Sequence, residues 1–388
     1  MRIQAAFDPM ALTRRLSQQP MRRSVWWLVV VVALVSAWWT PAMADTVAPS
    51  DDRASERSDS ATIFDERPAD GDALRRASDA SIGVMVRAVE GSASADTLGE
   101  TRRGTGVVIS PDGVVLTIGY LILEAEEVDL VLDDGRQIPA RPLAYDPVTG
   151  FGLVQALLPL PVAAVPLGSS ASVREDETLM FVSGGEGGAV SPAHLVARGQ
   201  FAGYWEYLID GAMMTAPMRP DHSGAGLYNR HGELVGIGSL ALPDAAASVS
   251  PNAGDLTRKA PGRHDPGNLF VPVDLLKPIL AELRSKGRSQ ASRRAWLGLN
   301  CMVLDGVLTV LRVSRDGPAQ AAGLLPGDRI LRLDGTPVSD LPAFYQRLWT
   351  GGDAERDVQL RVRRGNESQD LSLHSVDRQA TLKQATGI

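Results

Sequence analysis

The chain has 388 residues, a length typical of two domains rather than one. Its composition, 44% hydrophobic and 22% charged with 38 Gly and 25 Pro, excludes a collagen-like, coiled-coil or wholly disordered protein. The single cysteine, Cys301, excludes an intrachain disulfide framework and a Cys/His zinc site. The formal net charge of −7 disfavours nucleic acid as a partner.

Residues 1–44 have the layout of a secretory signal. Arg22 and Arg23 precede an apolar run over 25–39, and the small-x-small motif Ala42-Met-Ala44 follows. This pattern predicts cleavage after Ala44 and an exported, periplasmic protein. The run is shorter than the about 20 residues that span a bilayer, so contact with a membrane is expected only if the segment stays uncleaved. Met21 is an alternative start.

The next 36 residues are predicted to be a flexible acidic linker. Residues 45–80 are rich in Asp, Glu, Ser, Ala and Arg, and Ile63 and Phe64 are the only two bulky apolar residues that are adjacent. Such a segment buries too little apolar surface to offset the entropy lost on ordering. Residues 1–44 hold five Arg and one Asp, so their removal leaves a net charge of −11.

Short strand patterns recur from Ser81 onward. Turn signals such as Ser110-Pro-Asp-Gly113 and Asp133-Asp-Gly135 separate them, with Gly where a positive φ is favoured. Strands spaced in this way predict an antiparallel β-barrel or β-sandwich. A long surface loop is expected over 241–268. The predicted strands cover 81–87, 106–109, 114–117, 128–132, 178–182, 226–228 and 233–237.

A helix and a linker are expected to divide the chain into two folded domains. Asp274 is a favoured N-cap, and an apolar stripe from Leu275 to Leu283 predicts a helix that ends at Gly287. The basic, polar residues 285–294 follow as a linker. We therefore expect one domain over 81–274, a helix and linker over 275–294, a second domain over 295–377 and a tail over 378–388.

The second domain carries specific motifs. Trp296-Leu-Gly-Leu299 comes first, then Gly317-Pro-Ala-Gln-Ala-Ala-Gly-Leu324 and Pro326-Gly-Asp-Arg-Ile330. This combination resembles the PDZ domains of bacterial proteases. The resemblance implies that Trp296, Leu297, Gly298 and Leu299 form a loop whose backbone N–H groups bind the terminal carboxylate of a peptide, which adds to the domain as an extra strand.

Two helices are predicted within this domain. Pro318 begins a short helix that Gly323 ends, and Asp340 caps a second helix over 341–349. In the second helix, Phe344 and Leu348 lie one turn apart and either line the peptide groove or belong to the core.

Three further stretches are similar to the HtrA/Deg family of trypsin-like periplasmic serine proteases. They are Gly104-Thr-Gly-Val-Val-Ile-Ser-Pro-Asp-Gly-Val-Val-Leu-Thr117, the segment from Asp133 to Thr149, and Pro220-Asp-His-Ser-Gly-Ala-Gly-Leu227 with Gly232-Glu-Leu-Val-Gly-Ile237. The resemblance implies a mainly β fold, with a trypsin-like double β-barrel followed by an α+β PDZ domain.

The family's catalytic triad is degenerate in this sequence. Tyr120 stands in place of the general-base histidine, and Gly150 stands in place of the aspartate that orients it. Ser223 keeps the nucleophile position, but Asp221 replaces the glycine whose N–H builds the oxyanion hole. A protonated tyrosine cannot readily take the serine proton, so a pseudoprotease is predicted. His222 is adjacent to Ser223, but neighbouring side chains on an extended segment diverge.

These features predict an exported HtrA-like protein that binds polypeptides or protein C-termini through its PDZ domain. It would act as an adaptor, a chaperone or a regulatory subunit in envelope protein quality control. The resemblance also implies a homotrimer or a hetero-oligomer with an active relative, and no cofactor or metal is expected. The alternatives are an active serine endopeptidase with a rearranged site using Ser223, and a small-ligand module using the vacant cleft.

Overall fold

The computed structural model describes residues 71–175, 177–249 and 265–383. The predicted signal segment, most of the predicted linker and most of the 241–268 loop lie outside these ranges. In the described ranges, no helix combines the length and apolar character needed to cross a membrane.

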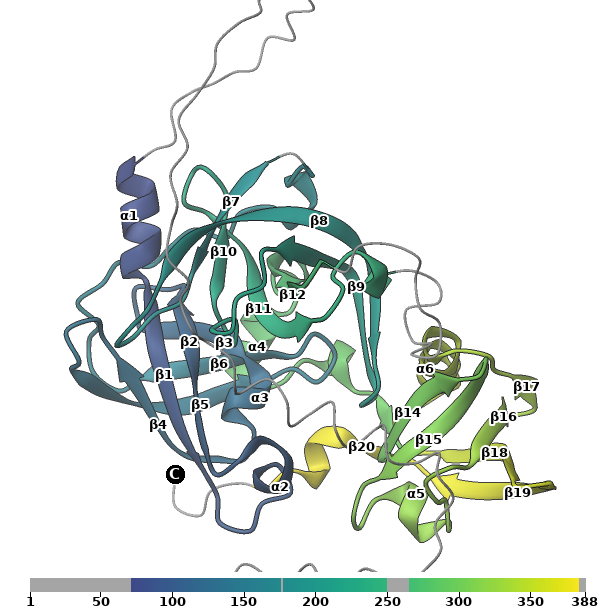
Figure 1. The fold of residues 1–388 in the computed structure, drawn as a ribbon. Coiled ribbons are helices and arrows are strands. Elements are labelled where there is room, and N and C mark those ends of the chain that lie inside the picture. The colour runs from purple at the N-terminus through teal and green to yellow at the C-terminus, as the bar shows by residue number, and fades with distance from the viewer. Residues whose placement is uncertain (1–70, 176, 250–264, 384–388) are drawn as a thin grey trace, which may run out of the picture. The chain divides into compact units, whose positions relative to one another are not determined.

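The expected pair of β-barrels is confirmed, and the first barrel is built from six antiparallel strands (Figure 1). Its strands close in the order β1-β2-β3-β6-β5-β4, so no edge is left unpaired. Alternating and continuous apolar runs fill the interior, and all five residues of Val114–Ile118 are buried. The strands are β1 Ser81–Ala88, β2 Thr101–Val108, β3 Val114–Ile118, β4 Ala125–Val131, β5 Gln137–Tyr145 and β6 Phe151–Ala156.

The second barrel repeats this construction with the order β10-β11-β12-β9-β8-β7. Its tight turns use the predicted glycines. Gly232, for example, has a φ of 71° and donates its N–H to the Asn229 carbonyl before β11 begins. The strands are β7 Thr178–Val182, β8 Val190–Gly203, β9 Tyr207–Ala216, β10 Gly226–Tyr228, β11 Leu234–Leu242 and β12 Gly267–Pro272.

A smaller α+β fold follows the barrels. Its main sheet has the order β14-β15-β16-β18-β19 with β17 paired to β16, and β13 pairs with β20. The two predicted helices are confirmed as α5 Pro318–Ala321 and α6 Leu341–Thr350, and the Asp340 carboxylate accepts the Ala343 N–H at 2.8 Å. The strands are β13 Ala295–Trp296, β14 Leu299–Leu304, β15 Val307–Val313, β16 Arg329–Leu333, β17 Thr336–Pro337, β18 Asp357–Arg364, β19 Glu367–His374 and β20 Val376–Asp377.

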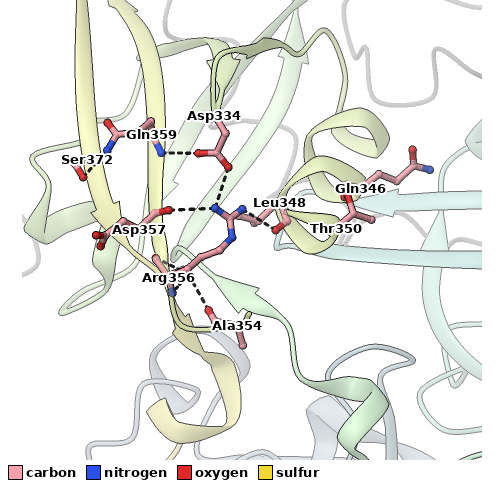
Figure 2. A network of polar contacts seen from close by, with 10 residues as sticks. Asp334, Gln346, Leu348, Thr350, Ala354, Arg356, Asp357, Gln359 and Ser372 are labelled. Atoms are coloured by element: carbon pink, nitrogen blue, oxygen red, sulfur yellow. Dashed lines mark hydrogen bonds and ion pairs between the residues drawn. The ribbon is translucent and has the colours of Figure 1, made fainter. Parts of the chain in front are cut away.

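Arg356 joins helix α6 to the sheet of this fold (Figure 2). Its guanidinium donates to the Asp334 carboxylate at 2.9 Å and to the carbonyl oxygens of Asp357 at 3.2 Å and Leu348 at 3.1 Å. The same Asp334 carboxylate accepts the N–H of Gln359 at 2.9 Å. This charged pair, whose Asp334 lies in the β16–β17 turn, therefore satisfies backbone groups at the helix end and in strand β18.

Two sequence-based boundaries need correction. The linker expected over 45–80 ends in a helix, α1 Gly71–Asp79, because Ala73 and Ala77 lie one turn apart and are buried. The helix expected after Asp274 is shorter than predicted. A 3-10 turn, Val273–Leu275, comes first, and helix α4 covers Leu280–Lys286.

The later start of α4 has a physical reason. The Asp274 carboxylate, expected to cap the helix, instead accepts the N–H of Ala171 at 2.9 Å and pairs with Lys277 at 2.7 Å. Pro278 has no N–H to continue a helical ladder from 275. At the other end, Gly287 closes the helix as predicted, with a φ of 72° and its N–H on the Leu283 carbonyl.

Candidate functional site

Tyr120 lies on a single helical turn at the end of strand β3. This turn, α3 Gly119–Ile122, is held against the β5–β6 connection because Gly119 donates its N–H to the Gly150 carbonyl at 2.6 Å. The contact brings together Tyr120 and Gly150, two residues separated by 30 positions in the sequence.

Ser223 lies in the loop between β9 and β10, and its backbone is fixed from both barrels. Thr105 of β2 donates its N–H to the Ser223 carbonyl at 2.8 Å, and Gly224 donates to Gly238 of β11 at 2.8 Å. Gly224 has a φ of 75°, and a Cβ there would lie 2.0 Å from the Thr105 carbonyl oxygen. Only glycine fits this contact, so the loop presents the serine in one position.

The Tyr120 hydroxyl is hydrogen-bonded to Ser223. Its oxygen lies 2.8 Å from Ser223 Oγ and 2.9 Å from the Ser239 carbonyl oxygen, and it donates toward both. Burial raises the pKa of Tyr120 to about 12, although the hydrogen bond to Ser223 lowers it. The phenol is therefore neutral near pH 7, and a neutral phenol is a poor acceptor for the serine proton.

An aromatic side chain fills the space beside Gly150, the position at which the family resemblance implies an aspartate. A Cβ at Gly150 would lie 2.8 Å from the Tyr207 hydroxyl oxygen and 3.1 Å from the same ring. Tyr207 is buried and donates its hydroxyl to the Thr149 carbonyl at 2.9 Å. Gly150 also has a φ of 78°, which disfavours any side chain. An aspartate at position 150 would therefore require Tyr207 to move.

Asp221 carries a fixed negative charge two residues before the serine. The Arg219 guanidinium donates to both of its oxygens, at 3.1 and 3.0 Å, and the Ser183 hydroxyl donates to Oδ2. Burial opposes ionisation, but the hydrogen bonds from Arg219 and Ser183 outweigh it and hold the pKa of Asp221 below its usual range. The residue is ionised at neutral pH, which disfavours a second negative charge nearby.

The histidines of the described chain do not replace the missing base. His222 donates Nδ1–H to the Arg219 carbonyl at 3.0 Å, and burial lowers its pKa. His194 and His231 are exposed, and His374 pairs with Asp357. In the ranges that the structure covers, none of these rings is hydrogen-bonded to Ser223 Oγ. His264 lies outside those ranges.

Asp146 does not act in place of the aspartate either. Its Oδ2 accepts the N–H and the hydroxyl of Thr149 at 2.8 and 2.5 Å, which closes the turn before β6. In this structure Asp146 is a turn residue.

The loop from Trp296 to Leu299 already has a carboxylate in place. Leu297 donates its N–H to the Glu206 carboxylate at 3.3 and 3.1 Å, and Leu299 donates at 2.8 Å. Gly298, between them, has a φ of 79°, and a Cβ there would lie 3.2 Å from Ser314 Cβ and from the Trp296 ring. The backbone therefore presents N–H groups to an anion, as the resemblance implied, and the anion is a side chain of this chain.

Phe344 and Leu348 are fully buried. They belong to one apolar cluster with residues of the β14–β19 sheet and with Leu208 of β9. In this structure they are core residues, and no part of either side chain is exposed to solvent.

Several residues of these sites were not predicted from the sequence. Tyr207 lies against Gly150, Ser183 and Arg219 bind Asp221, and Glu206 binds the backbone loop. None of these residues belongs to a motif that the sequence analysis singled out. In the described ranges, no group of three or more His, Cys, Asp or Glu side chains is arranged to hold a metal ion.

Comparison with known proteins agrees with this construction. Residues 104–237 match the trypsin-like peptidase domain family, and residues 295–374 match the PDZ domain family. A probable periplasmic serine endoprotease DegP-like from Pseudomonas putida (strain W619) is 25% identical over 283 residues, which cover 68% of this chain and 54% of the relative. The protein of the same description from Brucella suis biovar 1 is 26% identical, covering 70% and 52%.

Among solved structures, the HtrA-type protease AlgW with decapeptide is similar at 21% identity with a TM-score of 0.47, covering 79% of this chain and 98% of that one. The serine endoprotease from Yersinia pestis is similar at 20% identity with the same TM-score, covering 79% and 96%.

Two β-barrels that present a serine loop, followed by a PDZ domain, define a trypsin-fold peptidase homologue. The predicted resemblance to the HtrA/Deg family is confirmed by the two matched domains, their order and the DegP-like relatives. The chain spans about half the length of the curated relatives it matches.

Proposed function

We propose that this chain is a proteolytically silent HtrA-like protein that binds polypeptides through its PDZ domain. It serves as an adaptor, a chaperone or a regulatory subunit in envelope protein quality control. The main support for proteolytic inactivity is the 2.8 Å hydrogen bond between the Tyr120 hydroxyl and Ser223 Oγ. The neutral phenol of Tyr120 is hydrogen-bonded to the Ser223 hydroxyl, whereas a catalytic triad would place a base there.

Two other features support the same proposal. Tyr207 fills the space that an aspartate at 150 would need, and ionised Asp221 replaces a neutral oxyanion-hole glycine. In serine protease triads, the rate that survives loss of the base comes from the oxyanion hole and from binding. A chain with both parts altered has no evident source of residual turnover.

The test is fluorophosphonate labelling of the purified chain, together with casein digestion, using Ser223→Ala as the matched control. We expect the wild-type chain to show no labelling and no cleavage above this variant. Labelling at Ser223 with turnover of casein would instead support an active endopeptidase with a rearranged site.

Export to the periplasm belongs to the same proposal. The predicted cleavage after Ala44 and the periplasmic descriptions of the relatives support it. Assembly as a homotrimer, or with an active relative, rests on the family resemblance. Fractionation of cells and light scattering of the purified protein test these two statements separately.

Peptide binding is tested with labelled decapeptides that carry either a free C-terminal carboxylate or an amide. We expect free-carboxylate peptides to bind more tightly. Gly298→Ala should weaken this binding, because a Cβ there meets Ser314 and Trp296. Gly306→Ala is the control, since Gly306 has a similar φ of 71° and a Cβ there would meet no atom within 4 Å.

A further inference from the structure

We propose that the carboxylate-binding loop of the PDZ domain holds an internal ligand, the Glu206 side chain on the β8–β9 hairpin, and that a polypeptide C-terminus binds only by displacing it. This inference rests on the proposed peptide-binding function and adds its regulation. The hairpin segment is defined as residues 203–207, between the end of β8 and the start of β9.

The first observation is the chemistry of the contact. The Glu206 carboxylate accepts N–H groups from Leu297 and Leu299, the residues on either side of Gly298. A terminal carboxylate and a glutamate carboxylate present the same acceptor oxygens to such a loop. The side chain therefore occupies the position in which a peptide would end.

The second observation is a backbone contact beside the sheet. Strand β14 is the outer strand of its sheet, so one of its edges is free to pair with another chain segment. Cys301 of β14 donates its N–H to the Tyr204 carbonyl of the hairpin at 2.9 Å. This is the kind of bond that an added peptide strand forms.

The third observation is that helix α6 also holds the hairpin. The Tyr345 hydroxyl donates to the Gly203 carbonyl at 2.7 Å and accepts the Glu206 N–H at 3.0 Å. Leu208, just after the hairpin, is buried in the same apolar cluster as Phe344 and Leu348. The loop, the edge strand and the helix, the three parts that a bound peptide would use, all contact this one segment.

Glu206 adopts a backbone conformation that is unusual for its residue type. Its φ is 61°, in the left-handed region that glycine prefers, yet the side chain is buried. The Glu206→Gly variant therefore removes the carboxylate while it favours the backbone conformation. Asp305→Gly is a matched control, because Asp305 is also an acidic residue at positive φ, 52°, but is exposed in the β14–β15 turn.

The experiment measures two properties of the full chain and of both variants. The first is the affinity for labelled decapeptides with a free carboxylate or a C-terminal amide. The second is amide hydrogen exchange in fragments that contain Leu297 and Leu299. We expect Glu206→Gly to bind free-carboxylate peptides at least about tenfold more tightly than the wild-type chain and to exchange faster at Leu297 and Leu299. Asp305→Gly should behave as wild type in both.

The outcomes separate this inference from the proposed function. Equal peptide affinity of the wild-type chain and Glu206→Gly, with unchanged exchange at Leu297 and Leu299, overturns the internal ligand and leaves peptide binding intact. If no peptide binds any variant, the proposed function fails, and the exchange data still decide whether Glu206 occupies the loop. Equal binding of amidated peptides by Glu206→Gly also overturns the inference, because the freed site would not recognise a carboxylate.

Discussion

Tyr120 and Tyr207 make packed, hydrogen-bonded contacts around Ser223 and Gly150. Tyr120 holds the serine hydroxyl, and Tyr207 occupies the volume beside Gly150. Tyr120 follows strand β3 of the first barrel, and Tyr207 begins strand β9 of the second barrel, so the two contacts come from different barrels. Restoring the triad therefore requires more than exchanging the three altered residues.

We predict that Tyr120→His with Gly150→Asp does not restore labelling by fluorophosphonate. A side chain at 150 would meet the Tyr207 hydroxyl oxygen at 2.8 Å, so this variant should also lose about 1–3 kcal/mol of stability to overpacking. Thermal unfolding measures the loss. Gly135→Asp is the control for the backbone, because Gly135 has a similar φ of 80° and a Cβ there would meet no atom within 4 Å. Equal destabilisation by both changes would contradict the packing argument.

The carboxyl group of Glu206 has a pKa near neutral pH in the folded chain. Burial raises its pKa to about 7, against the lowering effect of the N–H groups of Leu299 and Leu297 and of the Arg378 charge. The thiol of Cys301 and the hydroxyl of Tyr345 also face it, and burial raises the pKa of both, so they stay neutral. Arg294 and Arg378 line the small cavity beside it.

The sign of the resulting pH dependence follows from linkage. Between about pH 4.5 and pH 7, the folded chain keeps a proton on Glu206 that the unfolded chain releases. The free energy of unfolding contributed by this group is therefore largest below about pH 4.5, falls as pH rises through this window, and levels off above pH 7. The expected change over the whole window is about 3 kcal/mol.

Urea unfolding followed by tryptophan fluorescence at about pH 5 and about pH 8 measures this contribution. The wild-type chain should lose more stability between the two pH values than Glu206→Gly, and the difference between the two proteins isolates Glu206. An identical pH dependence in both would show that Glu206 titrates normally.

At the scale of elements, Arg356 shows how one ion pair connects a helix to a sheet. Its pair with Asp334 has side chains only 14% and 22% exposed, whereas the pair of Arg361 and Asp370 on the neighbouring strands is 50% and 61% exposed. Removing one partner of a shielded pair leaves buried polar groups without partners, and removing one partner of an exposed pair does not.

We therefore predict that Arg356→Met destabilises the PDZ domain by about 2–3 kcal/mol, and that Arg361→Met costs less than about 1 kcal/mol. Both substitutions keep an unbranched side chain of similar length. Chemical denaturation of the full chain, with Trp349 on helix α6 as a reporter, compares them. Similar losses of stability in the two variants would contradict the argument that the low solvent exposure of the Arg356–Asp334 pair in Figure 2 makes it more stabilising than the exposed pair.

At the scale of the whole molecule, the segment after β20 returns to the first barrel. Gln379 donates its side-chain amide to the Tyr145 carbonyl at 2.5 Å, and Lys383 donates its N–H to the Glu124 carboxylate at 2.8 Å. Arg378 reaches the Trp205 carbonyl of the hairpin segment at 3.4 Å. The Arg378 contact joins the C-terminal segment to the hairpin, and the other two contacts anchor that segment on the first barrel.

Deletion of residues 378–388 should loosen the hairpin, because it removes all three contacts. We expect amide exchange at Leu297 and Leu299 to be at least about threefold faster. This corresponds to a decrease of less than about 1 kcal/mol in the free energy of local opening. Truncation after Lys383 keeps the contacts named above and is the matched control. Unchanged exchange in the longer deletion would show that the hairpin is held without help from the C-terminal segment.

Much of the architecture could be predicted because its causes are local. Turn glycines such as Gly135 and Gly232 depend on φ alone, and strand β1, Ser81–Ala88, follows from a run of strand-forming residues. Helix α6 was predicted from the Asp340 cap. The start of α4 was not, because the Asp274 carboxylate binds Ala171, which lies 103 positions away in the sequence.

By itself, the sequence determined the order of the domains and the identity of the altered positions, Tyr120, Gly150 and Asp221, because these can be read in motifs of contiguous residues. Only the tertiary structure decided what fills the two sites. Tyr207 occupies the space beside Gly150, and the Glu206 carboxylate accepts the Leu299 N–H. Both results come from packing and hydrogen bonding between segments far apart in the chain, where no local pattern specifies which side chain meets which.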